Sequence, residues 1–202
     1  MPCPRTCGTK KGNIAYTQNV RVQQNDNYTQ EMNDLIYLET ERTIMRNLSV
    51  DDAQNFHELN LDKDVLKYTG DNPFKNKNEA QEFLKNYDQY SKFGVGRLAV
   101  INKENNEFIG WCGLKYTEQT DEFDIGFRFY KKYWNKGFAT ETAIKNLEFG
   151  FKTLGINKIV GRVMVDNIAS IKVLKKIGLN LKSEFNFDGQ KGLIYEIKMP
   201  IP

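Results

Sequence analysis

The sequence has too few cysteines and histidines for most metal, disulfide or histidine-dependent sites. Its 202 residues include three cysteines and one histidine. Cys3 and Cys7 lie in a polar segment without the second ligand pair that a zinc site requires, and an odd cysteine count makes no disulfide framework. Cys112 lies inside an apolar strand, so we interpret it as a small core residue. A Ser-His-Asp triad could draw only on His57, which we interpret as structural. We therefore expect no metal.

Long hydrophobic runs and a strong charge excess are also missing. No run approaches the ~18 apolar residues of a membrane span, and the N-terminus lacks the apolar core of a signal peptide. We therefore expect a reducing, cytoplasmic location without membrane contact. The formal net charge is +3, from 29 basic and 26 acidic residues. This near balance gives weak support to an anionic ligand and little to nucleic acid as a partner.

The N-terminal segment differs in composition from the rest of the chain. Residues 1–31 are polar, have few large apolar side chains and show no periodicity, so we expect a flexible tail. Met32 comes just before a strand-like run and is a candidate for the native start. We expect residues 32–202 to form a single domain.

Hydrophobic periodicity changes several times along that domain. Helical spacing is expected over residues 49–59, 65–68, 77–90, 139–151 and 167–177. Strands are expected over residues 38–48, 98–101, 107–116, 123–129, 158–165, 181–187 and 193–198. Runs of strands joined by tight turns, with helices inserted early and after the fourth strand, predict a mixed α+β domain.

Residues 133–143 read as a tight loop that runs directly into a helix, preceded by the strand candidate 123–129. The first turn of a helix leaves backbone N–H groups without partners and carries partial positive charge. Gly137 allows a ligand to approach the backbone closely, and Lys132 and Lys136 add cationic charge. The stretch therefore predicts a phosphate or pyrophosphate site. The alternative is an ordinary strand-to-helix loop that holds no ligand.

Four stretches occur in order between residues 38 and 199. They are Leu38–Arg42, Phe108–Leu114, Tyr133–Glu141, and Asp166–Ile171 followed by Leu174–Leu179. Together they resemble the GNAT acetyltransferases, most closely the branch of ribosomal-protein N-terminal acetyltransferases. The resemblance implies the GNAT fold, a twisted and mostly antiparallel sheet of six to seven strands. About four helices would flank this sheet, which would be splayed between strands four and five.

The resemblance also implies acetyl-CoA as the acyl donor and a primary amine as the acceptor. In the family, the strand before the loop and the strand after the helix diverge, and the pantetheine arm lies between them. Here those strands would be 123–129 and 158–165, with the pyrophosphate at the loop. The residues implied in acetyl-CoA binding are Phe127, Arg128, Phe129, Trp134, Asn135, Lys136, Gly137, Phe138, Ala139, Thr140, Asn167 and Ser170.

Direct transfer requires a neutral acceptor amine and a proton for the departing CoA thiolate. Asp124 is the candidate base, and Glu122 shares its strand face; the alternative for both is a solvated carboxylate. Many relatives carry a tyrosine as the acid on the helix after strand five, where this chain has Leu174. The resemblance to the branch implies Ser170 as the substitute, the alternative being a first-turn serine that bonds to backbone.

Several questions stay open at the level of sequence. The acceptor could be a protein N-terminus or a small amine such as an antibiotic or polyamine, because the motifs constrain the early helices least. A non-catalytic acyl-CoA binder, serving as a sensor or interaction domain, is the alternative function, since the tyrosine is missing. The chain could act as a monomer or a homodimer.

Overall fold

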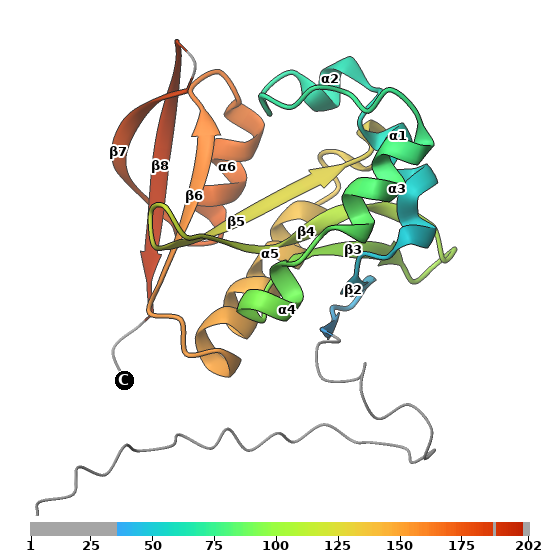
Figure 1. The fold of residues 1–202 in the computed structure, drawn as a ribbon. Coiled ribbons are helices and arrows are strands. Elements are labelled where there is room, and N and C mark those ends of the chain that lie inside the picture. The colour runs from blue at the N-terminus through green and yellow to red at the C-terminus, as the bar shows by residue number, and fades with distance from the viewer. Residues whose placement is uncertain (1–35, 188, 200–202) are drawn as a thin grey trace, which may run out of the picture. The chain divides into compact units, whose positions relative to one another are not determined.

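The computed structural model describes residues 36–187 and 189–199. The expected tail at residues 1–31 and the candidate start at Met32 lie outside the described residues. The described chain forms one sheet with helices on both faces, so the predicted mixed α+β class is confirmed (Figure 1).

The sheet has eight strands in the order β1-β2-β3-β4-β5-β6-β8-β7. The strands are β1 Tyr37–Glu39, β2 Thr43–Asn47, β3 Arg97–Asn102, β4 Phe108–Thr117, β5 Glu122–Phe129, β6 Lys158–Met164, β7 Asn180–Phe187 and β8 Gln190–Lys198. Within the described sheet, only β5 and β6 pair in parallel, and the other neighbours are antiparallel. A parallel pair needs a long crossover connection, and helix α5 Phe138–Glu148 supplies it.

The prediction of one strand over residues 38–48 is wrong. This segment is a hairpin of β1 and β2, and the extra strand explains why the sheet exceeds the predicted six to seven strands. Thr40 N donates to Thr43 O at 2.9 Å, and Thr43 N donates to Thr40 Oγ1 at 3.0 Å. A threonine hydroxyl that bonds locally to backbone offers the chain a turn in place of a continuing strand.

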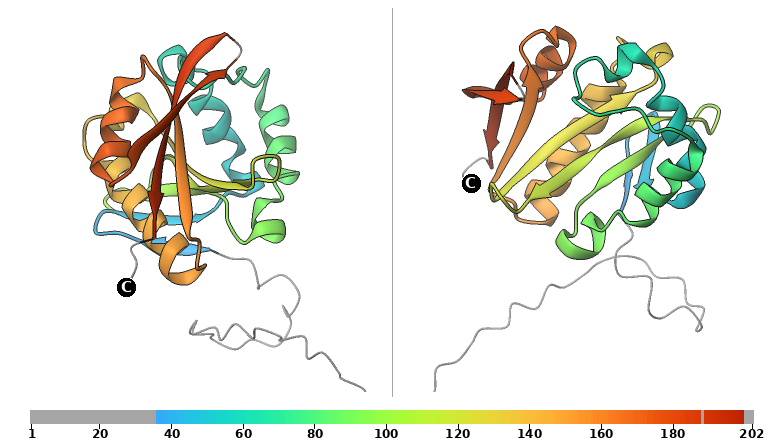
Figure 2. Two further views of the ribbon diagram at one scale, coloured as in Figure 1. Left: turned by 90° about the vertical axis from the view of Figure 1, so that its left-hand side faces the viewer. Right: turned by 45° about the horizontal axis from the view of Figure 1, so that its top comes forward.

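The helices divide between the two faces of the sheet (Figure 2). They are α1 Ala53–Leu59, α2 Lys63–Leu66, α3 Lys77–Lys85, α4 Gln89–Phe93, α5 and α6 Ile168–Lys176, with 3-10 turns η1 Val50–Asp52 and η2 Lys131–Tyr133 and the π-helical turn η3 Phe149–Thr153. The side chains of α1 and α3 pack on Ala99 and Phe108, whereas α5 and α6 pack on the opposite face, against residues such as Cys112 and Ile125. Cys112 is fully buried there, as predicted.

The prediction of one helix over residues 77–90 is also wrong, because α3 and α4 are separate. Asn86 ends α3, and its side-chain Nδ2 donates to Glu82 O at 2.8 Å. After this break, Arg97 N donates to Tyr87 Oη at 2.9 Å and Leu48 N donates to Tyr90 Oη at 2.9 Å. The break therefore lets both tyrosines bond to the backbone of neighbouring segments.

Other helix boundaries follow their predicted signals more closely. Ser49 caps η1 in a capping box with Asp52, at the start of the predicted helical stretch 49–59. Helix α2 begins two residues before the predicted 65–68 because Asp62 caps it, with Oδ1 accepting from Asp64 N at 2.9 Å. Gly178, which follows α6 with φ +92°, adopts the left-handed conformation expected at a helix end.

Strands β5 and β6, which are the fourth and fifth of the predicted strands, diverge, so the predicted splay is confirmed. Their register contains only the pairs Phe123–Ile159 and Asp124–Val160, near the start of each strand. Beyond these pairs β6 turns away from β5, as Figure 1 shows. Ile125 and Phe129 point into the core and are buried, while Phe123 and Phe127 on the same face are half-buried. The diverging edges leave one side of β5 without a partner strand over residues 125–129.

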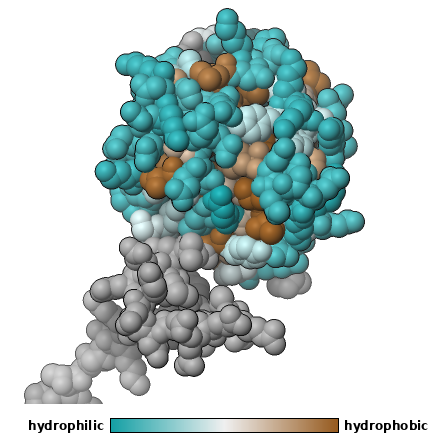
Figure 3. All heavy atoms as spheres, turned by 90° about the vertical axis from the view of Figure 1, so that its right-hand side faces the viewer, coloured by the Kyte–Doolittle hydropathy of each residue, from teal (hydrophilic) through white to brown (hydrophobic). Residues whose placement is uncertain are grey.

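One face of the molecule is mainly hydrophilic, with separate apolar patches (Figure 3). Among the residues that the structure describes, no helix has both the length and the hydropathy to cross a membrane.

Candidate active site

The loop between β5 and α5 presents unpaired backbone N–H groups. Gly137 is the N-cap residue of α5 with φ +85°, and Asn135 also has a positive φ of +58°. The first four N–H groups of a helix have no partner within the helix, and Gly137 has no side chain that could cap them. A Cβ atom at Gly137 would meet only Arg42 Nη2, at 3.4 Å, among atoms beyond its chain neighbours. The start of α5 is therefore open to an anion.

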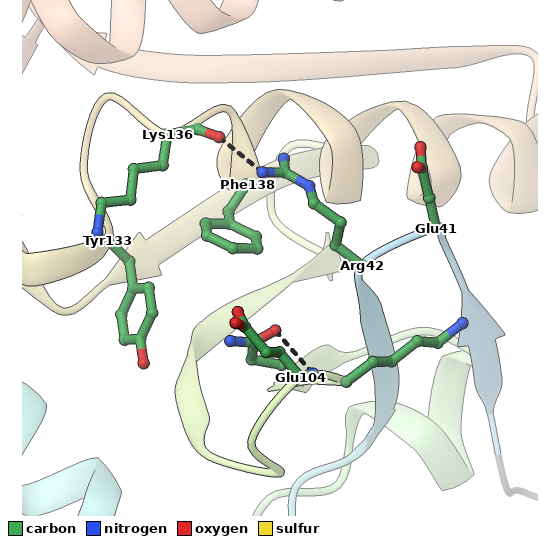
Figure 4. Close-up of a pocket in the computed structure, with 8 residues that line it drawn as sticks. Glu41, Arg42, Glu104, Tyr133, Lys136 and Phe138 are labelled. Atoms are coloured by element: carbon green, nitrogen blue, oxygen red, sulfur yellow. Dashed lines mark hydrogen bonds between the residues drawn. The ribbon is translucent and has the colours of Figure 1, made fainter.

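Arg42 holds this loop from the turn between β1 and β2 (Figure 4). Its Nη1 donates to Lys136 O at 3.0 Å, and its Nη2 lies 2.5 Å from Glu141 Oε2. Burial opposes ionisation of Glu141, but hydrogen bonds from Thr40 and Arg42 lower the pKa of this carboxyl below its ordinary value.

Beside the loop lies a pocket of about 400 Å³. The side chains around it come from the loop, from the β1–β2 turn and from the β3–β4 turn. Its lining residues are Glu41, Arg42, Asn102, Lys103, Glu104, Tyr133, Lys136 and Phe138. Arg42 and Lys103 pair with Glu141 and Glu39 outside the lining, so the lining carries no positive excess, and the feature that suits an anion is the backbone at the start of α5.

The open edge of β5 offers main-chain hydrogen bonds next to this loop. Tyr130 N donates to Ile109 O on β4 at 3.1 Å. Successive residues of a strand direct their N–H and C=O groups to opposite edges, so those of Phe129 and Phe127 point away from β4 and into the splay. Trp134 closes the far end of this edge, because its Nε1 donates to Phe129 O at 2.8 Å.

The residues predicted to bind acetyl-CoA in the loop and on β5 present different groups to the splay. The backbones of Phe127 and Phe129 face the splay, and the backbones of residues 135–140 form the helix start. Arg128 does not face the splay. Its C=O points toward Gly110 on β4, and its side chain donates to Asn60 and Asp71 on the face of the sheet that α1 and α3 cover. A strand edge suits an arm that carries amides, and the helix start suits a pyrophosphate, so the residues present fit acetyl-CoA.

The N-terminus of α6 follows β6, the second strand of the splay. Asn167 caps this helix, and its Oδ1 accepts from Ser170 N at 3.1 Å, at the start of the predicted helix 167–177. Ser170 is half-buried, and its Oγ has no hydrogen-bond partner among the described residues. Leu174 is buried and would touch a Cβ placed on Gly161, so it belongs to the packing between α6 and β6.

The candidate base Asp124 lies on the face of β5 that α1 and α3 cover. Its Oδ2 is 2.5 Å from Arg97 Nη2, and both side chains are about 15% exposed. Arg97 Nη1 also donates to Asp124 O at 3.0 Å. Because a charge-assisted pair of this kind is strong, Asp124 is held in one orientation.

Glu122 lies on the same face, at the closed end of the splay. It pairs with Arg162 on β6, with Lys158 at 3.5 Å and with Lys182 on β7 at 3.4 Å between Nζ and Oε1. Burial opposes ionisation, but these cations, Arg162 foremost, lower the pKa of Glu122. Glu122 is therefore a carboxylate at neutral pH, and it bridges strands on both sides of the splay.

Sequence reasoning missed a group of side chains on this face. The guanidinium carbons of Arg97 and Arg128 lie 5.4 and 5.3 Å from the ring centroid of Trp111. The indole Nε1 of Trp111 is buried and has no hydrogen-bond partner in residues 36–187 and 189–199. The three residues lie far apart in the sequence, so no short motif indicates that they form a group. The strand register brings them together, because Trp111 pairs with Arg128 and Arg97 pairs with Gly113, two residues after Trp111.

A second pocket, of about 520 Å³, opens between α1 and the start of the loop after β5. Its lining includes the carboxylates of Glu58, Asp62 and Glu107 and the amines of Lys131 and Lys132. Lys132 Nζ donates to Glu107 at 2.8 Å, and Lys131 pairs with Asp64 outside the lining, so Glu58 and Asp62 give the α1 side a negative character.

Comparison with known proteins identifies the class. The family model described as acetyltransferase (GNAT) domain matches residues 42–180. The N-acetyltransferase p20 of Bacillus licheniformis, itself uncharacterised, is 30% identical over 165 residues, which cover 80% of this chain and 93% of that protein. The chain therefore belongs to the GNAT acetyltransferases.

Further relatives agree with this assignment. The spermidine N(1)-acetyltransferase of Vibrio cholerae is 24% identical over 72% of this chain and 86% of its own length. A GNAT acetyltransferase from Bacillus anthracis has a TM-score of 0.71 at 25% identity, covering 81% of this chain and 99% of its own. The ribosomal-protein-S5-alanine acetyltransferase of Vibrio fischeri has a TM-score of 0.71 at 15% identity, covering 82% of this chain and 97% of its own, and shares the fold.

Proposed function

We propose that this acetyltransferase moves an acetyl group from acetyl-CoA directly to a primary amine. The observation that carries the proposal is the juxtaposition of the uncapped start of α5 with the open edge of β5. Acetyl-CoA supplies an activated acetyl group as a thioester. The N–H groups of residues 138–140 hold its pyrophosphate, and the backbones of Phe127 and Phe129 hold its pantetheine arm.

The chain's own residues then manage two protons. Ser170 Oγ is the proposed donor of the proton that the leaving sulfur needs, and its freedom from other partners among the described residues leaves it available. Asp124 and Glu122 are the proposed acceptors of the amine proton, directly or through water. Asp124 pairs with Arg97 and Glu122 pairs with Arg162, so both carboxylates are fixed in position on this face of the sheet.

The acceptor approaches from the side of α1, according to this proposal. Glu58 and Asp62 give the second pocket a negative wall there. A polyamine and the N-terminus of a ribosomal protein are both cationic amines, and relatives named for each exist. The resemblance of the motifs favours the branch of ribosomal-protein acetyltransferases. A free buried thiol at Cys112 agrees with a reducing compartment such as the cytoplasm.

Turnover tests the proposal. The protein would be incubated with acetyl-CoA and, in separate reactions, spermidine and peptides that begin with alanine or serine, while free CoA thiol is measured over time. We expect thiol release above the buffer rate with at least one amine, and an acetylated product by mass spectrometry. Saturable acetyl-CoA binding with no release for any amine would instead support the alternative, a non-catalytic acyl-CoA binder.

A further inference from the structure

Arg42, on the turn between β1 and β2, makes several contacts with the loop before α5 and with the first turn of that helix. Besides the bonds to Lys136 O and Glu141 Oε2, Arg42 Nε donates to Glu141 Oε2 at 2.7 Å and Arg42 N donates to Glu141 Oε1 at 3.1 Å. Its guanidinium carbon also lies 4.2 Å from the ring centroid of Phe138. One side chain thus contacts the residue before Gly137, the residue after it and the first acidic residue of the helix.

We propose that Arg42 is a positioning residue that sets the loop in its ligand-binding conformation, with Glu141 as its anchor. The inference rests on the proposed binding of acetyl-CoA. We call the pair Arg42 and Glu141, with the bond to Lys136 O, the loop latch. It joins segments that are 99 residues apart in the chain.

The loop needs such a latch at residues 135–137, because among the described residues the bond from Arg42 Nη1 to Lys136 O is the side-chain hydrogen bond that holds them. Asn135 and Gly137 both have positive φ values, of +58° and +85°, and no side chain caps the helix. Ordering these residues costs conformational entropy, which would otherwise be lost when the ligand binds. A latch that orders the loop beforehand leaves more of the interaction energy for affinity, which is the general effect of preorganisation.

The rival explanation is that Arg42 binds the pyrophosphate itself through its charge. A substitution at Glu141 distinguishes the two explanations, because they predict opposite changes in the affinity for acetyl-CoA. Glu141→Gln keeps the positive charge of Arg42 and removes a negative charge beside the site, so a direct charge contact would strengthen. The same substitution weakens the anchor of the latch, so a positioning role predicts weaker binding.

Arg46 provides a matched control on the same hairpin. Its Nη1 is 2.7 Å from Asp52 Oδ2 and its Nη2 is 2.8 Å from Asp52 Oδ1, and its side chain is 40% exposed against 41% for Arg42. Within the part of the chain that the structure describes, Arg46 makes no hydrogen bond or ion pair with residues 133–141. Arg46→Met therefore removes a comparable ion pair from the same element without touching the loop.

The experiment is calorimetric titration of the full chain with acetyl-CoA and with S-acetylpantetheine, which lacks the pyrophosphate. We expect Arg42→Met and Glu141→Gln each to raise the Kd for acetyl-CoA about tenfold and to leave that for S-acetylpantetheine unchanged. Arg46→Met should leave both Kd values unchanged, even though its Tm falls. A general loss of structure would move both ligands together, so the ratio of the two affinities isolates the loop.

Each other outcome overturns the inference in a recognisable way. Unchanged or tighter acetyl-CoA binding by Glu141→Gln, with weaker binding by Arg42→Met, would assign Arg42 to direct charge contact. Wild-type binding with no effect of either variant would make the latch purely structural. Absence of wild-type binding would overturn the proposed function itself, together with the latch. If Arg42→Met does not fold, the isosteric Glu141→Gln decides the question alone.

Discussion

The two sides of the splay differ in the groups they present, which are backbone groups on one side and paired side chains on the other. The side that we propose binds acetyl-CoA, called the donor side, presents backbone N–H and C=O groups at the start of α5 and the edge of β5, and its residues are defined by φ values and by which edge of the strand their backbone faces. The side that we propose receives the amine, called the acceptor side, is the face under α1 and α3, and it presents paired side chains such as Arg97 with Asp124 and Arg128 with Asp71. A backbone site needs local conformation, whereas a side-chain site needs several distant residues at once.

This difference predicts that the two sides respond to different substitutions. The acceptor side should lose stability when one member of a pair is removed, because the partner charge is left without compensation. The donor side should lose affinity when backbone conformation is disturbed.

The largest expected effect is on the acceptor side, from Asp124→Asn. It leaves Arg97 charged and mostly shielded from water, so we expect the free energy of unfolding to fall by about 3 kcal/mol. Urea unfolding followed by circular dichroism measures this. The control is Asp88→Asn, which breaks the exposed pair with Lys92 and should change the free energy of unfolding very little. Equal losses in both variants would contradict the difference between the two sides.

Gly137→Val should have the next largest effect, and it acts on the donor side. A β-branched residue does not tolerate φ +85°, so the loop must change shape and we expect the Kd for acetyl-CoA to rise on the order of a hundredfold. Gly155→Val is the matched control, since Gly155 has φ +65° with no atom within 4 Å of its Cβ position. Both variants should lose similar stability, and calorimetry should show weaker binding only for Gly137→Val.

Ser170→Ala tests chemistry at the splay with a smaller expected effect. The pKa of a thiol is about 8.5, so the CoA sulfur is a weakly basic leaving group, and loss of its proton donor should lower kcat only about tenfold. The Kd for acetyl-CoA should stay within twofold of wild type, which calorimetry checks. Lower affinity without a change in kcat would instead make Ser170 a binding residue.

The smallest effect concerns the pH dependence of stability at Glu122. Its folded-state pKa is lowered, so its contribution to stability is present above its unfolded pKa, about 4.3, and is lost as pH falls through the folded value. We expect Glu122→Gln to destabilise the protein at pH 7 and the gap to wild type to close on acidification. Urea midpoints measured from pH 7 to pH 3 test this. A gap that widens toward pH 3 would have the wrong sign.

The same division explains what the sequence could predict. The loop at Gly137, the strand before it and the cap at Asn167 were predictable because each depends on a few consecutive residues. The splay and the GNAT fold followed from four local stretches in order. By contrast, the hairpin at residues 37–47 was missed because its turn depends on threonine hydroxyls rather than on glycine or proline.

The long-range ion pairs could not be predicted from the sequence, because they depend on how distant segments pack together. Arg128 is 57 residues from Asp71, and Arg97 is 27 residues from Asp124. Nothing near either arginine in the sequence indicates its partner, because the strand register and the position of the segment between α2 and α3 bring the pairs together. The break between α3 and α4 was missed because Tyr87 continues the apolar face of the helix, although its hydroxyl accepts a bond from Arg97 N.

Hydrogen–deuterium exchange with and without acetyl-CoA tests the central claim most directly, because it reports on backbone groups along the chain. We predict slower exchange in peptides that cover residues 125–141 when acetyl-CoA is present, since the edge of β5 and the start of α5 supply the hydrogen bonds. Peptides over residues 53–85 should exchange at the same rate in both conditions. Protection of residues 53–85 with no change over 125–141 would contradict the assignment of the donor site to the splay.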